Sequence, residues 1–318
     1  VKFTLLSNKS LFLFKLNKLK DRMKIVQLLG LMFLSGTMLA QQPYFEVGLF
    51  GGVANYYGDM THDYVVPKES HPAYGGFIKY NMDPKKGFKF NIYSGTVSAA
   101  DKNSDRANLN ARNLSFTSNV TEVAFTFEYN FLGYRPVEFK QRISPYAYAG
   151  LAGFHFNPQA YYEGEWYDLQ PLGTEGQGME IFPFREKYRL YEFAIPFGVG
   201  FKFAMTERWN IGLEYGARWT FTDYLDDVSR TYVDRNLLIE ANGIDAYNLS
   251  NRSGEYLLGE PFDYQNNDWR GDPTNNDWYM WFGVTLSRNM IKGVEEGFRT
   301  STKDILGCPG PRHINKVK

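Results

Sequence analysis

Along most of the chain after residue 40, large apolar residues alternate with polar or small ones. In the clearest segment, residues 121–131, valine, phenylalanine and tyrosine hold the odd positions from 123 onward. Glutamate, alanine, threonine and asparagine hold the even positions. A period of two places these sets on opposite faces of a β-strand. A row of large apolar side chains opposite carboxylates suits a strand with one face against an extended apolar medium.

The alternation predicts eight strands, over residues 44–55, 73–82, 88–99, 121–131, 145–157, 191–203, 209–221 and 278–287. The connections after the second, fourth and sixth strands are short (83–87, 132–144 and 205–208). Those after the first, third, fifth and seventh are long (56–72, 100–114, 158–188 and 224–277). Short turns at one end and long loops at the other are typical of outer-membrane barrels. A secreted β-sandwich would explain the alternation but not this rhythm of connection lengths.

We therefore expect an all-β fold, an eight-stranded antiparallel up-and-down transmembrane β-barrel with long extracellular loops and a periplasmic C-terminal tail. An even number of strands places both chain ends on one side, and we expect that side to be the periplasmic face of the bacterial outer membrane. The composition agrees, because 17% aromatic residues with a mean hydropathy of -0.42 give apolar surface that is rich but discontinuous.

The start of the chain carries a targeting pattern. Basic residues precede an apolar run of about 15 residues, which is shorter than the ~20 residues of a spanning helix. We predict a secretory signal peptide over residues 23–40, preceded by an upstream start extension over residues 1–22. A membrane anchor is the alternative. The barrel is expected over residues 41–288 and the periplasmic tail over residues 289–318.

The polar face of each strand is expected to point into the lumen. In the fifth strand we expect the small residues Ala147, Ala149 and Gly153 to face inward, because a narrow barrel needs small residues there. Its aromatic residues are then expected to face outward: Tyr146, Tyr148, Phe154 and Phe156. Tyrosine and tryptophan near strand ends would line the two membrane interfaces: Tyr44, Tyr129, Tyr146, Tyr191, Trp209 and Trp278.

Nine charged residues fall on the expected lumen face: Glu46, Lys79, Lys89, Glu122, Glu128, Glu192, Lys202, Glu214 and Arg218. The five acids and four bases nearly cancel. Charges removed from bulk water persist when they are paired and hydrogen-bonded, so we predict a charge network that plugs the lumen. An eight-stranded barrel is just wide enough for side chains to fill it, which argues against a diffusion pore. A catalytic pair of carboxylates is the alternative interpretation.

Other chemistry is sparse. The chain carries 35 basic and 35 acidic side chains, so its charge gives no reason to expect a nucleic-acid partner. No metal, other cofactor or catalytic residue is expected, because no two histidines stand at ligand spacing: His62, His71, His155 and His313. The acidic segment 266–272 does not fit calcium-loop spacing and is expected to be a solvated loop. Two alternatives stay open: an enzyme acting on lipid or peptide at the outer rim through His155, and a small-solute channel.

The expected tail contains the single cysteine of the chain, Cys308. An odd cysteine in an oxidising compartment indicates either a free thiol or an intermolecular disulfide. We hypothesise that Cys308 and the nearby Arg312 contact a periplasmic partner.

Three segments resemble the PorG proteins of the type IX secretion system. They are residues 46–59, which contain Tyr-Tyr-Gly-Asp, residues 145–153, and residues 211–229, which contain Thr-Asp-Tyr-Leu-Asp-Asp-Val. The resemblance implies a non-enzymatic outer-membrane barrel, surrounded by outer-membrane lipid, in a secretion and gliding apparatus. It also implies two partners, a periplasmic ring lipoprotein and its partner subunit, which the barrel helps to anchor to the outer membrane.

Overall fold

The computed structural model describes residues 43–61, 63, 66–138 and 141–291. These residues belong to one compact unit of the chain, Gln42–Lys318. The expected signal peptide and most of the expected tail, including Cys308 and Arg312, lie outside the described residues.

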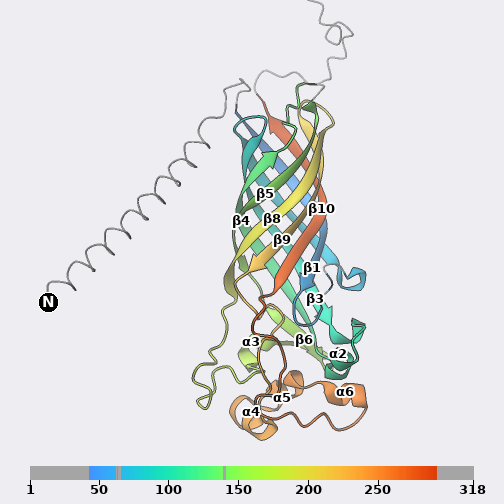
Figure 1. Cartoon of the computed structure of the whole chain (residues 1–318), viewed down its shortest axis with the longest axis vertical. Coiled ribbons are helices and arrows are strands. Elements are labelled where there is room, and N and C mark those ends of the chain that lie inside the picture. Colours follow the sequence, from blue (N-terminus) through green and yellow to red (C-terminus); the bar gives the residue numbers. More distant parts are fainter. Residues whose placement is uncertain (1–42, 62, 64–65, 139–140, 292–318) are drawn as a thin grey trace, which may run out of the picture. The chain divides into compact units, whose positions relative to one another are not determined.

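Eight strands form the wall of a closed barrel: β1 (Tyr44–Tyr57), β2 (His71–Asn81), β3 (Lys86–Ala100), β4 (Ser115–Asn130), β5 (Ile143–His155), β8 (Tyr191–Ala204), β9 (Trp209–Thr220) and β10 (Trp278–Met290). They pair antiparallel in the order β3-β2-β1-β10-β9-β8-β5-β4, and pairing of β3 with β4 closes the sheet (Figure 1). The predicted fold class is therefore confirmed. The last strand runs two residues past the predicted boundary at 288, since Asn289 and Met290 still pair with Glu46 and Phe45.

The outer wall of the barrel is apolar. Leu49, Phe125 and Phe193 are 67%, 55% and 71% exposed, whereas Ala124 and Ala194 on the inner face are 1% exposed. An exposed apolar surface that encircles a closed sheet is the lipid-facing surface of an outer-membrane barrel. Among the described residues, no helix has the length and apolar character needed to cross a membrane.

The predicted facing of β5 is wrong. Tyr146, Tyr148, Phe154 and Phe156 are all at most 5% exposed and face inward, whereas Leu151, which faces outward, is 71% exposed. Room for the tyrosines comes from glycines on neighbouring strands. A Cβ at Gly200 would lie 2.3 Å from Cζ of Tyr146, and one at Gly216 would lie 1.9 Å from the Tyr148 hydroxyl.

The expected interfacial girdle is wrong for two of its members. Tyr44 and Tyr146 are 6% and 4% exposed, because both lie on the inner face of the barrel. Tyr191 and Trp209, at 73% and 40% exposed, lie on the outer wall as expected.

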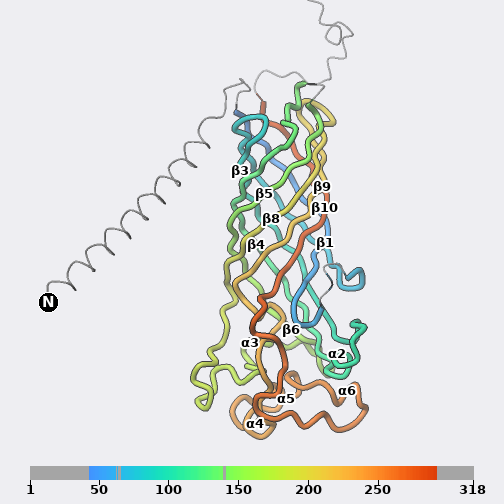
Figure 2. Tube along the Cα trace, viewed as in Figure 1, coloured from blue at the N-terminus to red at the C-terminus, as the bar shows by residue number. Residues whose placement is uncertain are grey.

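The long loops fold into structure that the alternation did not predict. They contain a hairpin of β6 (Pro158–Tyr162) and β7 (Glu165–Asp168), in which β6 pairs with β4 beyond the end of β5. They also contain short helices: η1 (Pro67–Glu69), η2 (Asp101–Asn103), α2 (Ala107–Arg112), α3 (Leu169–Leu172), α4 (Arg235–Asn242), α5 (Ile244–Ser250) and α6 (Ser253–Leu257). We call the described residues of the four long loops, 58–70, 101–114, 156–190 and 221–277, the cap (Figure 2).

Two apolar clusters hold the cap. The larger one continues from the lumen, where Tyr93, Tyr279 and Trp281 are buried, into the cap at Leu225 and Leu249. A smaller one lies within the cap and consists of Met179, Val233, Leu238, Ala246 and Tyr247. The cap therefore packs onto the barrel and also has apolar packing of its own.

Candidate functional site

The first ion-pair group of the lumen lies toward the short turns. Lys79 Nζ lies 2.7 Å from Glu46 Oε2 and 3.5 Å from Glu128 Oε1. Lys202 forms an ion pair with the same Glu128 oxygen. These four side chains are at most 5% exposed, so each charge depends on its partners rather than on water.

The second group joins β3 to β9 across the lumen. Lys89 Nζ lies 2.6 Å from Glu214 Oε2, and the Tyr146 hydroxyl donates to the same oxygen at 2.8 Å. The Lys89 ammonium also lies 4.9 Å from the centroid of the Tyr148 ring, a cation–π distance. The inward tyrosines of β5 thus bind the lumen charges rather than lipid.

The third group lies closer to the cap. Arg218 donates to both oxygens of Glu122, from Nε at 2.8 Å and from Nη2 at 3.1 Å. The Tyr279 hydroxyl and the Asn91 amide donate to the same carboxylate at 2.8 and 3.2 Å. A bidentate arginine pair with two further donors satisfies the buried charge.

The structure thus pairs eight of the nine predicted lumen charges, but not Glu192. Glu192 lies at the loop end of β8, opposite Phe154 of β5, and is only partly buried. Apolar side chains, among them Phe154 and Ala194, fill the lumen at that depth. Its inclusion in the network is therefore wrong, because depth along the strand decides which inward residues reach the charged layer.

These groups leave almost no space inside the barrel. The cavity among the first two groups has a volume of about 10 Å³ and is lined by residues that include Glu46, Lys79, Lys89, Glu128 and Glu214. That volume is about what one water molecule needs. The described lumen is therefore filled by side chains, as the charge balance predicted.

Uncharged polar residues close the short-turn end. The Asn210 side chain donates to Asn289 Oδ1 at 2.8 Å and accepts from the Tyr134 hydroxyl at 2.7 Å. The Ser287 hydroxyl donates to Glu46 at 2.6 Å, which links this layer to the first ion-pair group. We did not predict these residues, although the alternation places Asn210, Ser287 and Asn289 on the lumen face.

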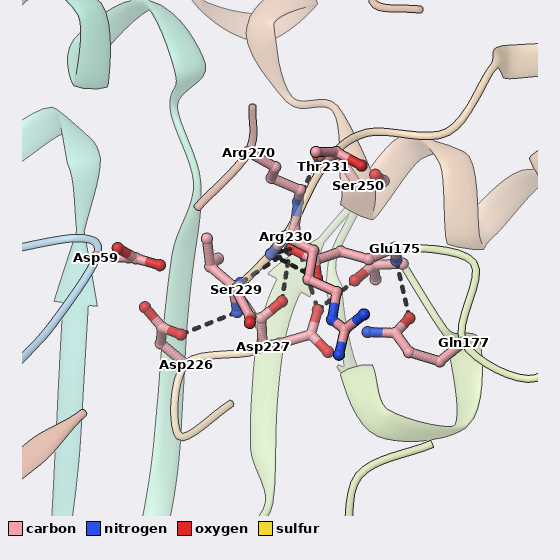
Figure 3. A network of polar contacts seen from close by, with 12 residues as sticks. Asp59, Glu175, Gln177, Asp226, Asp227, Ser229, Arg230, Thr231, Ser250 and Arg270 are labelled. Carbon is pink, nitrogen blue, oxygen red and sulfur yellow. Dashed lines mark hydrogen bonds and ion pairs between the residues drawn. The ribbon is translucent and has the colours of Figure 1, made fainter. Parts of the chain in front are cut away.

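A second polar centre lies in the cap, around the guanidinium of Arg270 (Figure 3). Arg270 Nη1 lies 3.0 Å from Glu175 Oε1, and Nη2 lies 3.6 Å from Asp227 Oδ2. The same guanidinium donates to the backbone carbonyls of Asp227 and Ser250 at 2.5 and 3.2 Å. Arg270 is only 3% exposed, so the expectation of a solvated loop over 266–272 is wrong at this residue.

The two acids at this centre also order the backbone around them. The Glu175 carboxylate accepts from the backbone N–H groups of Ser229 and Arg230 at 3.0 Å (Figure 3). Asp227 accepts from the hydroxyls of Thr174 and Tyr188. Burial raises the pKa of Asp227 to about 6, although Arg270 acts in the opposite direction. These contacts join three segments that are far apart in the chain, those around Glu175, Asp227 and Arg270.

Four further carboxyl groups lie beside this centre: Asp59, Asp223, Asp226 and Asp277. The Tyr56 hydroxyl lies 2.5 Å from Asp226 Oδ2 and 2.9 Å from Asp277 Oδ1. Asp226 and Asp277 are fully buried, and Asp223 is 8% exposed. Tyr56, Asp59, Asp223 and Asp226 lie in two segments that carry the resemblance described above, but nothing in the sequence joined them, since the Tyr56 and Asp226 side chains that touch are 170 residues apart.

The other predicted chemistry is not assembled into a site. His155 packs its ring against Tyr191, with ring centroids 4.6 Å apart, at the loop end of the wall. Within the described residues, no group of three or more histidine, cysteine, aspartate or glutamate side chains is arranged to hold a metal ion.

Solved structures similar to this chain are outer-membrane proteins. Ail, the attachment invasion locus protein of Yersinia pestis, is 7% identical with a TM-score of 0.37, over 79% of this chain and 100% of that one. Neisserial surface protein A is 9% identical with a TM-score of 0.33, over 78% of this chain and 99% of that one. OprG from Pseudomonas aeruginosa is 9% identical with a TM-score of 0.33, over 77% and 97%. At these identities the similarity concerns the fold alone.

None of the curated proteins matches this chain. A family model described as "Domain of unknown function (DUF6089)" matches residues 23–171 and 184–239, which together make up more than half of the chain. The chain therefore belongs to the DUF6089 family.

Proposed function

We propose that this chain is a non-enzymatic outer-membrane component of a type IX protein secretion and gliding apparatus, and that it helps to anchor the periplasmic ring to the outer membrane. The specific part of this proposal comes from the resemblance of residues 46–59, 145–153 and 211–229 to PorG proteins. A membrane-embedded barrel with an apolar outer wall is the kind of element that such an anchor requires.

The filled lumen is the structural observation that best supports this role. Ion pairs and inward tyrosines leave a cavity of about 10 Å³, which is far too small for a solute path. A barrel whose interior is occupied serves better as a rigid support than as a conduit. The same observation weighs against the small-solute channel.

The proposal places both chain ends and the short turns in the periplasm, facing the ring lipoprotein and its partner subunit. On this orientation the turn over residues 131–142 and the segment after Met290 are the parts nearest the ring. Cys308 and Arg312 would then be available to a periplasmic partner.

Co-purification from detergent-solubilised membranes tests the proposal. An affinity tag is inserted next to Leu258, which is 93% exposed in the cap, so that both chain ends stay native. We expect the ring lipoprotein and its partner subunit to co-purify with the full chain. Recovery of the folded barrel without either subunit would contradict the ring-anchoring role.

A truncation then separates the tail from the barrel. The deletion covers residues 292–318 and spares Asn289, because that side chain is 2% exposed and bonds Asn210 inside the barrel. Loss of the ring subunits on truncation assigns the contact to the tail, and their retention assigns it to the turns. Non-reducing gels of native and Cys308→Ala cells test the disulfide, since identical mobility would exclude it.

A further inference from the structure

The hydroxyl of Tyr56 lies between two buried carboxyl groups, at 2.5 Å from Asp226 Oδ2 and 2.9 Å from Asp277 Oδ1. All three side chains are at most 2% exposed. A phenol carries one proton and can donate it to one acceptor. If both carboxyls were ionised, one of the two contacts would set two oxygen acceptors against each other without a proton. The geometry therefore requires a second proton in this group.

The position of that proton follows from the remaining contacts. The other oxygen of Asp226 accepts from the Val228 backbone N–H at 2.9 Å. The other oxygen of Asp277 accepts from the Leu225 backbone N–H at 2.9 Å. Each carboxyl thus has one oxygen that binds a backbone donor and one that faces Tyr56. The extra proton belongs on an oxygen that faces the phenol.

The nearby guanidinium groups are engaged with other acids. Arg112 makes a two-bond pair with Asp101, at 2.7 Å from both Nε and Nη2. Arg270 pairs with Glu175 and Asp227. In the described part of the chain, none of these ion pairs includes Asp226 or Asp277. Their charge must therefore be neutralised in another way.

Two more carboxyls lie at this place. The Asp223 side chain is only 8% exposed, and within the described residues no ion pair neutralises it, although Ser229 lies within hydrogen-bonding reach. Asp59 binds the backbone N–H of Asp272 at 3.0 Å through one oxygen. An ionised carboxylate buried without a partner is costly, and the usual response is protonation.

We propose that Tyr56, Asp226 and Asp277 form a proton-sharing latch that joins β1 to both ends of the last long loop, so that the protonated cap is closed and rising pH opens it. Asp226 and Asp277 lie near the two ends of residues 221–277, and Tyr56 lies near the end of β1. The described residues offer no metal-holding group of three side chains, which favours protons over a bound cation. This inference goes beyond the anchoring role and does not depend on it.

The titration of the neighbours gives the direction. Burial raises the pKa of both Asp226 and Asp277 well above the ordinary value, and Asp59 adds to the effect on each. Burial raises the pKa of Asp59 to about 6 and that of Asp223 to about 9. A carboxyl with a raised folded-state pKa stabilises the fold below its unfolded pKa, and the stabilisation is lost as pH rises through the folded pKa. The cap should therefore loosen as pH rises above the ordinary carboxyl range, with the contribution of Asp59 lost past about 6 and that of Asp223 lost past about 9.

Infrared spectroscopy of the full chain, refolded in detergent micelles, tests the shared proton. A protonated carboxyl gives a C=O stretching band that a carboxylate lacks. We expect this band in the wild type at neutral pH, and a weaker band in Asp226→Asn and in Asp277→Asn. In each variant an amide replaces one of the two carboxyl groups, and the Tyr56 hydroxyl donates its proton to the carboxylate that remains. The second proton is then no longer needed, and the protonated carboxyl that gave the band is lost. Asp263→Asn, an exposed acid of the same loop, is the matched control and should leave the band unchanged.

Three outcomes would overturn the proposal. The first is absence of the band in the wild type at neutral pH. The second is an equal band in Asp226→Asn, Asp277→Asn and wild type. The third is loss of the band on addition of Ca²⁺ alone, which would make the group a cation site.

Protease cleavage within residues 221–277 tests the opening. For each proton that must leave, protection should fall by about tenfold per pH unit between the carboxyl's pKa in the open cap and its higher pKa in the closed cap, and should level off above the latter. We expect the Asp226→Asn and Asp277→Asn variants to keep the cap protected to higher pH than the wild type and Asp263→Asn. Rates are divided by those for an unfolded peptide cut by the same protease, which removes the pH dependence of the protease. A cleavage rate of the wild type that does not rise with pH, after this correction, would contradict the latch.

Discussion

Buried acids of the lumen and of the cap are neutralised in two different ways. In the lumen, Glu46, Glu122, Glu128 and Glu214 each lie within an ion pair of a lysine or arginine. In the cap, the carboxyls around Tyr56 outnumber the guanidinium groups, whose ion pairs go to other acids. Burial alone therefore does not set the charge state of a carboxyl, because its partners decide whether a cation or a proton neutralises it.

The two regions should respond differently to pH and to substitution. In the barrel each of these acids is held in an ion pair, so removal of one partner leaves an unbalanced buried charge. The cap carboxyls carry protons, so replacement of one of them by an amide leaves the balance nearly unchanged.

The largest effect is expected from Arg218→Met. This change leaves the Glu122 carboxylate with only the Tyr279 and Asn91 donors, in a site that is fully buried. Removal of one partner of a buried pair costs about 3–5 kcal/mol. Unfolding in urea, followed by the mobility shift of the folded barrel on gels, measures it. The double variant Glu122→Gln/Arg218→Met should recover much of the loss, and a double variant as unstable as the single one would contradict the pairing.

Gly200→Ala tests the inward orientation of β5 and should have the next largest effect. The new Cβ would lie 2.3 Å from Cζ of Tyr146, so the ring must move, at a cost of about 1–3 kcal/mol. The same urea measurement applies. Tyr146→Leu in the Gly200→Ala background should relieve the clash. If Gly200→Ala were neutral, Tyr146 would not face the lumen.

Tyr56→Phe should weaken the cap and leave the barrel intact. The change removes the hydroxyl that joins Asp226 to Asp277, and an unmade buried hydrogen bond costs about 1–3 kcal/mol. Faster cleavage within residues 221–277, with an unchanged urea midpoint for the barrel, is the expected result. A loss of barrel stability of the same size would mean that the two regions do not behave separately.

Arg135→Ala should have the smallest effect. Arg135 and Glu138 form an ion pair in the turn after β4, but their side chains are 22% and 51% exposed. Exposed pairs contribute less than about 1 kcal/mol because solvent and salt screen them. A shift in the urea midpoint comparable to that of Arg218→Met would contradict the distinction between buried and exposed pairs.

Local alternation was enough to predict the eight strands and most of the lumen charges. In β4, for example, every second residue from Glu122 to Asn130 is buried, as its polar character indicated. The facing of β5 could not be predicted in the same way, since Tyr146 and Tyr148 fit inside only because Gly200 and Gly216 lie opposite. That correspondence depends on strand register, which a single sequence does not give.

The structure of the cap could not be predicted from local alternation, because its contacts join distant segments of the chain. Arg270 and Glu175 are 95 residues apart, and no periodic pattern connects them. The 222–228 segment attracted notice only through its resemblance to PorG proteins. Glu192 shows the same limit inside the barrel, since alternation gives its face but not its depth.

Conductance in planar bilayers tests the filled lumen most directly. With the full chain refolded and inserted at neutral pH, the ion pairs and tyrosines around a cavity of about 10 Å³ predict no steady ion current. The double variant Tyr146→Ala/Tyr148→Ala, which removes two inward rings, should conduct more than the wild type. Steady channels of the wild-type chain would contradict the filled lumen and remove the structural support for a non-conducting anchor.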